Sequence, residues 1–172
     1  MDGNARLLRG VPVVAALVAA TLAAAPAASA ADAPRPGHLP PIFGLAFETA
    51  ARKLQDPACL GVLSDFRDAQ GNPLDANLAA TGMGATELLR ALRFVDGSGL
   101  GACRRPGIAA FTETGSRVVF VCPGELAAWA RGKGVRSAAD LLIHEELHAL
   151  GLGENPPTSE EITRAVGRRC NV

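Results

Sequence analysis

Apolar residues recur at three- and four-residue spacing through the middle of the chain, which is typical of helices that bury one face. The clearest run covers residues 42–54 and ends near Asp56-Pro57, where the proline interrupts the helical pattern. Shorter runs predict helices at 59–66 and 86–93. A later run predicts a helix that Ser137 caps and that packs four residues into the core, namely Leu142, Ile143, Leu147 and Leu150.

Strand-like segments follow in the second half of the chain. Two runs rich in apolar and β-branched residues predict strands at 108–111 and 117–121, joined by a hairpin turn at Thr114-Gly115-Ser116. The second run does not alternate, so we expect it to be buried on both faces. Residues 94–99 are strand-like before a turn, and residues 125–134 predict one short helical turn followed by a loop. These elements predict an α+β fold in which helices surround a short β-sheet.

The first thirty residues have the pattern of a secretory signal peptide. Arg6 and Arg9 precede an apolar run at 11–25, and the small-residue sequence Ala28-Ser29-Ala30 follows. We expect cleavage after Ala30. The alternative is a retained membrane anchor, for which the apolar run is short and rich in Ala.

Residues 31–41 are rich in Pro, so we expect a flexible lead-in there, with His38 exposed to solvent. Residues 42–172 then form a single domain, which is long enough to bury its own core. Over the whole chain, 17 Lys and Arg balance 17 Asp and Glu, and removal of residues 1–30 barely changes this balance. The charge therefore gives no reason to expect nucleic acid or, after cleavage, a membrane as a partner.

The four cysteines, Cys59, Cys103, Cys122 and Cys170, all lie outside the predicted signal peptide. In an exported chain, an even number of cysteines predicts two disulfides, and three pairings are possible. Cys103 and Cys122 bracket the predicted hairpin, so we expect them to pair. Cys59 would then pair with Cys170 and tie the last helix to the N-terminal helices.

The predicted helix after Ser137 carries two of the three histidines of the chain. His144 and His148 are four residues apart, so their imidazoles lie on one face of the helix. Two neutral imidazoles on adjacent turns can bind one divalent metal, and Zn²⁺ suits such a pair. Glu145 follows the first histidine directly, where an HExxH motif has its general base. This spacing predicts a metal site with an acid beside it.

The segment 144–154 resembles the HExxHxxGxxH signature of the metzincin zinc peptidases, and Leu150-Gly151-Leu152-Gly153 is especially close to the matrixin version. The resemblance implies a role for each matching position: zinc ligands at His144 and His148, the general base at Glu145, the turn glycine at Gly151, and the third ligand at Glu154. The segment differs from the family in having Glu at the last position. The chain also has no Met after Met83, and therefore no Met-turn.

A second acidic residue is an alternative third ligand. Thr158 or Ser159 is expected to cap a last helix, with Glu160 and Glu161 in its first turn. A Glu supplied by a second helix after HExxH resembles the gluzincin arrangement, which makes Glu161 the alternative to Glu154. Glu160 is expected to stabilise the positive end of the helix dipole.

The resemblance implies a small zincin-like domain that uses Zn²⁺ to hydrolyse a peptide or protein substrate. Glu145 would take a proton from the attacking water and pass it to the leaving nitrogen. In zincins an extended substrate pairs with a strand edge beside the active-site helix, so the strand at 108–111 or 117–121 would supply that edge. We therefore expect a secreted or periplasmic, monomeric zinc metallopeptidase.

Two other functions remain open at this stage. The first is a zincin-fold protein with weak or no catalysis that binds a metal or a partner. The absence of Tyr from the chain favours it, because several zinc peptidases use a Tyr to stabilise the oxyanion. The second is a disulfide-bonded domain in which the histidine motif is accidental.

Overall fold

The computed structural model describes residues 39–171. The predicted signal peptide, its cleavage after Ala30, the alternative of a retained anchor, His38 and most of the lead-in lie outside the described residues. Within residues 39–171, no helix combines the length and the apolar character needed to cross a membrane.

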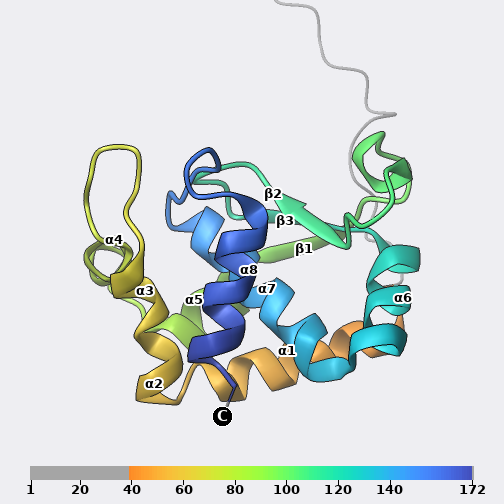
Figure 1. Ribbon diagram of the computed structural model, residues 1–172, viewed down its shortest axis with the longest axis horizontal. Helices are drawn as coiled ribbons and strands as arrows, with labels where there is room; N and C mark the ends of the chain where they lie inside the picture. Colours follow the sequence, from red (N-terminus) through yellow and green to blue (C-terminus); the bar gives the residue numbers. More distant parts are fainter. Residues whose placement is uncertain (1–38, 172) are drawn as a thin grey trace, which may run out of the picture. The chain divides into compact units, whose positions relative to one another are not determined.

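The described residues form a mixed α+β domain, which confirms the predicted fold class at that level (Figure 1). Its elements follow in this order: α1 (Pro41–Lys53), α2 (Pro57–Leu60), α3 (Val62–Asp65), α4 (Leu74–Ala80), α5 (Ala85–Ala91), β1 (Arg93–Asp96), η2 (Ala102–Arg104), β2 (Ala110–Thr112), β3 (Val118–Val121), α6 (Pro123–Lys133), α7 (Val135–Ala149) and α8 (Ser159–Arg169). The helix predicted at 59–66 is interrupted at Gly61 and forms as α2 and α3.

The sheet has three strands in the order β1-β3-β2. β1 runs parallel to β3, whereas β2 pairs antiparallel with β3, which confirms the predicted hairpin. Phe111 lies opposite Phe120, and their stacked rings are 5.0 Å apart. The prediction that β3 is buried on both faces was wrong, because Val119 and Val121 are buried whereas Val118 and Phe120 are half-buried. β2 is an edge strand of this sheet.

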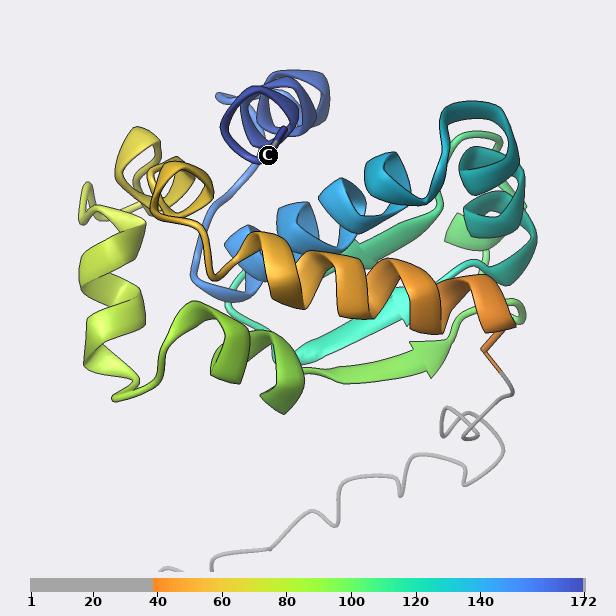
Figure 2. The same ribbon diagram turned by 90° about the horizontal axis from the view of Figure 1, so that it is seen from below.

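α7 is the central helix and packs against α1, α6, α8 and β2. Figure 2 shows α1 alongside α7. α1 buries the small side chains Ala46, Ala50 and Ala51, which allow close approach of a neighbouring helix. At the end of α1, the Nζ atom of Lys53 lies 2.6 Å from Asp140 Oδ1 of α7, and both side chains are largely buried.

The start of α7 differs from the prediction. The helix begins at Val135, directly after Gly134, whose φ of 87° lets the chain turn sharply out of α6. Ser137 therefore lies within the helix rather than at its cap, and its Oγ accepts a hydrogen bond from Trp129 Nε1 at 2.9 Å. The predicted loop at 132–134 was also wrong in part, because α6 starts at Pro123 and continues through Lys133.

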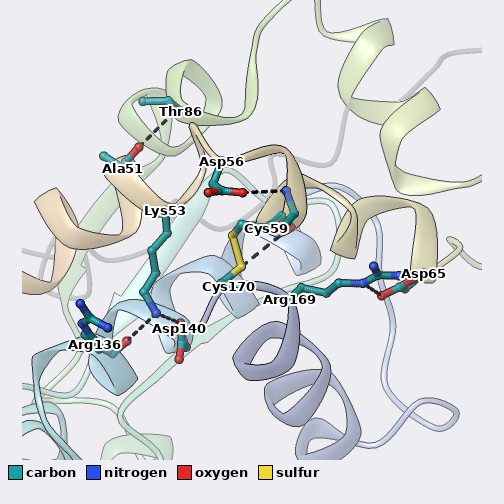
Figure 3. Close-up of a disulfide and its surroundings, with 11 residues drawn as sticks. Ala51, Lys53, Asp56, Cys59, Asp65, Thr86, Arg136, Asp140, Arg169 and Cys170 are labelled. Carbon is teal, nitrogen blue, oxygen red and sulfur yellow. Dashed lines mark hydrogen bonds and ion pairs between the residues drawn. A yellow bond between two sulfur atoms is a disulfide. The ribbon is translucent and has the colours of Figure 1, made fainter. Parts of the chain in front are cut away.

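Both expected disulfides are present. Cys103–Cys122 joins η2 to the start of α6. Cys59–Cys170 joins α2 to the end of α8, and Figure 3 shows it close to the ion pair of Arg169 with Asp65. Two disulfides indicate an oxidising compartment outside the cytoplasm.

Candidate metal centre

α7 brings the two predicted histidines together on one buried face. His144 and His148 occupy successive turns, and their Nε2 atoms are 2.9 Å apart. The exposed fractions of the two side chains are only 4% and 8%. The leucines and the isoleucine on the other side of the helix fill the core, so this face has a fixed position relative to the sheet.

The turn after α7 returns the chain toward the same point. The Gly151 N–H donates to the His148 carbonyl at 3.0 Å, and the Leu152 N–H donates to the Leu147 carbonyl at 3.0 Å. This pair of bonds is a Schellman motif, and Gly151 supplies its left-handed residue with a φ of 104°. The turn carries Glu154 back over the helix, where its Oε1 lies 3.4 Å from His148 Nε2 and 3.7 Å from His144 Nε2.

These three side chains fit a divalent cation. One ligand atom from each of His144, His148 and Glu154 lies within 4.8 Å of the others. Zinc at about 2.0–2.1 Å from each tetrahedral ligand requires ligand separations of about 3.3–3.4 Å. The 3.4 Å distance from His148 to Glu154 matches this requirement, whereas the 3.7 Å distance from His144 to Glu154 is a few tenths of an ångström long and the 2.9 Å distance between the nitrogens is a few tenths short. The group can therefore hold a metal ion after a small adjustment of the rings.

Each histidine is oriented by a second contact. His148 Nδ1 lies 2.7 Å from the Leu152 carbonyl oxygen, which only accepts hydrogen bonds, so Nδ1 carries the proton. The Nε2 lone pair of His148 is then free to face a metal. His144 Nδ1 lies 2.9 Å from Thr163 Oγ1 on α8, which can fix that ring in the same tautomer. Sequence reasoning missed Thr163, because no local pattern connects it to the histidine motif.

Burial keeps the first histidine neutral. The pKa of His144 is lowered to about 3, mainly by burial and further by the neighbouring His148. A neutral imidazole keeps the lone pair that a metal ligand needs. His144 is thus prepared to bind a cation across the physiological pH range.

Glu145 lies beside this group but is not part of it. The side chain is buried, and its Oε2 has no hydrogen-bond partner among the described residues. Burial raises the pKa of Glu145 to about 8; the Thr112 hydroxyl opposes this rise, and the Glu154 charge adds to it. A nearby divalent cation favours a carboxylate, so metal binding would lower this pKa. A pKa close to neutral pH lets a carboxyl group act either as a proton acceptor or as a proton donor.

The two acids of the last helix are engaged elsewhere. Glu161 Oε2 accepts hydrogen bonds from the backbone N–H of Thr158 at 2.8 Å and from its hydroxyl at 3.0 Å. The Thr158 hydroxyl in turn accepts from the Glu161 N–H, which completes a capping box. Glu160 pairs with Arg164 at 2.6 Å. The structure thus brings Glu154, rather than Glu161, to the histidines.

A cleft of about 470 Å³ opens over the candidate site. Its lining includes β2 with the residues after it, and also Glu154 and Ser159. The hairpin is attached to the end of α7, because the Gly115 N–H donates to the His148 carbonyl at 2.8 Å. The edge strand β2 therefore lines a cleft that contains both imidazoles and Glu145. A larger hollow of about 1120 Å³ lies along α8 and includes neither histidine.

Comparisons with known proteins add no family: no family model matches the chain, and no curated protein or solved structure is significantly similar to it.

Proposed function

We propose that this protein is a zinc-dependent peptidase that acts outside the cytoplasm. The observation that carries the proposal is the convergence of His144, His148 and Glu154 beside the buried acid Glu145, in a cleft lined in part by β2. Two histidines and one carboxylate make up the protein ligands of known catalytic zinc sites. The HExxH spacing and the resemblance to zincins support the same conclusion.

The chain's own residues supply the proton transfers. Zinc, when bound, would act as the Lewis acid that polarises the substrate carbonyl and acidifies water. Glu145 accepts a proton from the attacking water as the water oxygen bonds to the carbonyl carbon. The C–N bond then breaks, and Glu145 delivers the proton to the leaving nitrogen. The edge of β2 binds an extended substrate by main-chain hydrogen bonds and holds it across the site.

The exported location follows from two features of the chain. The disulfides require an oxidising compartment, and the sequence at 1–30 predicts a signal peptide that is cleaved after Ala30. The substrate would accordingly be an extracellular or periplasmic peptide or protein.

The proposal is tested on the purified mature chain by metal analysis and by cleavage of a quenched-fluorescence peptide library. We expect one zinc per chain and cleavage that a chelator abolishes. Glu145→Gln should retain zinc and lose cleavage by about 10²- to 10⁴-fold, because general acid–base catalysis is removed. Glu160→Gln is the matched control and should cleave as the wild type does, since Glu160 is exposed and, within residues 39–171, pairs with Arg164 alone.

Metal binding without catalysis is the second candidate. The chain has no Tyr, so no phenolic hydroxyl is available to stabilise an oxyanion. Stoichiometric zinc in a wild-type protein that cleaves no member of the library would favour this candidate. A wild-type protein without bound zinc would contradict both.

A further inference from the structure

The turn after α7 controls two parts of the candidate site. The Leu152 carbonyl accepts from His148 Nδ1, and the same turn carries Glu154 to the histidines. A displacement of this turn would therefore reorient one imidazole and withdraw the carboxylate. Any contact that fixes the position of this turn therefore also fixes the His148 ring and the Glu154 carboxylate.

A side chain from another helix fixes the position of this turn. The Nδ2 atom of Asn77, on α4, donates to the Leu150 carbonyl at 2.9 Å. This carbonyl is at the C-terminal end of α7, where the last carbonyls of a helix have no partner within the helix. The Asn77 contact thus ties the start of the turn to α4.

Asn77 is itself fixed by an acid. Its Nδ2 also donates to Asp68 Oδ2 at 2.9 Å, so both amide hydrogens are used. Asp68 accepts further hydrogen bonds from the backbone N–H groups of Gln70 and Asn72 and from Asn72 Nδ2. The donated bonds of Asn77 and Asn72 lower the pKa of Asp68 to about 2, which keeps this acceptor charged at neutral pH.

The turn is packed tightly onto this pair. A Cβ added to Gly151 would lie 3.3 Å from the Asp68 Cβ and 3.6 Å from Asn77 Nδ2. Gly151 also has a φ of 104°, which disfavours any side chain. A side chain at the left-handed residue of the Schellman motif would therefore press against the two residues that hold the motif.

We infer that Asn77, oriented by Asp68, is a positioning residue for the metal centre: it fixes the 150–154 turn and thereby places Glu154 and the backbone acceptor of His148. Asn77 contacts none of the three metal-binding side chains through its own hydrogen bonds. Its effect on the metal is transmitted through Leu150. The inference rests on the metal site of the proposed function, and it does not require that the protein cleave peptides.

The test measures zinc affinity by competition with a chromophoric chelator. Loss of a partner that hydrogen-bonds a ligand directly reduces metal affinity by about 10- to 100-fold. Asn77 acts one step further out, through the Leu150 carbonyl, so we expect Asn77→Ala to weaken zinc binding by about 10-fold, the lower end of that range. Asn72→Ala is the matched control, because Asn72 also donates to Asp68 but does not contact the turn. It should bind zinc nearly as tightly as the wild type.

A second readout separates positioning from general loosening of the fold. With Co²⁺ in place of zinc, the visible bands report the number and type of ligands, and Asn77→Ala should change them while Asn72→Ala should not. Asn77→Leu preserves the side-chain volume and removes both donors, so it serves if the alanine variant folds poorly. Far-UV circular dichroism and thiol titration verify the fold and both disulfides of each variant.

The outcomes are distinguishable. Wild-type zinc affinity and cobalt spectra in both Asn77 variants would overturn the inference and leave the proposed function intact. Equal losses in the Asn77 and Asn72 variants would also overturn it, because they would indicate a general role of this loop in stability. A wild-type chain that binds neither zinc nor cobalt would remove the metal site itself, and this inference with it.

Discussion

The Nδ1 atom of His144 lies 2.9 Å from the hydroxyl oxygen of Thr163, and this contact connects α7 to α8. The position of α8 is set independently of the histidines. The Cys59–Cys170 disulfide holds its C-terminal end, and a capping box begins it at Thr158. The orientation of one candidate ligand thus depends on a helix that has its own anchors.

Replacement of Thr163 by Val should weaken zinc binding by about 10-fold or more, because the His144 ring loses the acceptor that fixes its tautomer. Val has nearly the shape of Thr, so the packing of α8 should survive. Zinc affinity from chelator competition measures the effect. Thr49→Val is the control, because the Thr49 hydroxyl bonds to the Leu45 carbonyl on the exposed side of α1. Equal affinities in the two variants would mean that the Thr163 contact does not orient the ring.

The sequence predicted the parts of the site that lie within one stretch of chain. His144 and His148 share a helix face by their spacing, and Gly151 ends that helix as expected. Thr163 and Asn77 could not be predicted, because each reaches the site from another helix, and only the tertiary packing brings them there. Nothing in the local sequence distinguishes them from other surface residues of their helices.

The difference between what a side chain favours locally and what its structural context allows also explains which predictions of the fold were wrong. Ser137 has the side chain of a good cap, but the positive φ of Gly134 starts α7 earlier, and the Ser137 hydroxyl bonds to Trp129 instead. β3 reads as a fully apolar strand, yet the small sheet buries only alternate residues of it. The disulfide pairing was predicted correctly, because the hairpin brings Cys103 near Cys122 and leaves one other pair.

Glu154 and Glu161 should respond differently to truncation. Glu154→Ala should lower zinc affinity strongly, because it removes one of three converging ligand atoms. Glu161→Ala should leave zinc affinity unchanged and lower the thermal stability of the fold slightly, since it removes half of a capping box. Isothermal titration with zinc and thermal unfolding of each variant measure the two quantities. Loss of zinc binding in the Glu161 variant alone would assign the third ligand to α8.

Glu146 should destabilise the native state. Its side chain is 1% exposed, and both carboxylate oxygens lack a hydrogen-bond partner among the described residues. Burial raises the pKa of Glu146 well above its usual range, so the group is held protonated in the fold. Glu146→Met keeps a similar length, removes the unpaired polar atoms and should raise the free energy of unfolding by about 1–3 kcal/mol. Urea denaturation checks this, and a less stable Met variant would indicate an unseen partner for the carboxyl group.

The two disulfides should differ in their effects on stability and on the metal. Loop-closure entropy predicts a loss of about 5 kcal/mol without Cys59–Cys170 and about 3 kcal/mol without Cys103–Cys122, given sequence separations of 111 and 19. Only the first disulfide anchors the helix that carries Thr163. Its double-Ala variant should therefore also bind zinc more weakly at temperatures where the protein is folded. Equal zinc affinities in the two double variants would contradict this coupling.

The ion pair of Asp65 with Arg169, beside the Cys59–Cys170 disulfide, should make the stability of the fold depend on pH. The Arg169 guanidinium donates to both carboxylate oxygens of Asp65, at 2.8 and 2.6 Å, and this hydrogen bonding lowers the pKa of Asp65 below its usual 3.8. A carboxyl group whose pKa is lower in the fold stabilises the fold above pH 3.8, and that contribution is lost as the pH falls through the folded pKa. Asp65→Asn removes the titrating group.

We therefore expect Asp65→Asn to be less stable than the wild type at neutral pH, and the difference to shrink as the solution is acidified below the usual carboxyl range. Urea denaturation at a series of pH values from neutral to acidic measures this difference. Asp75→Asn is the matched control, because Asp75 accepts a hydrogen bond only from Ser64 and its own helix and has no cationic partner among the described residues. A difference that stays constant with pH would show that Arg169 stabilises Asp65 no better in the folded chain than solvent does in the unfolded one.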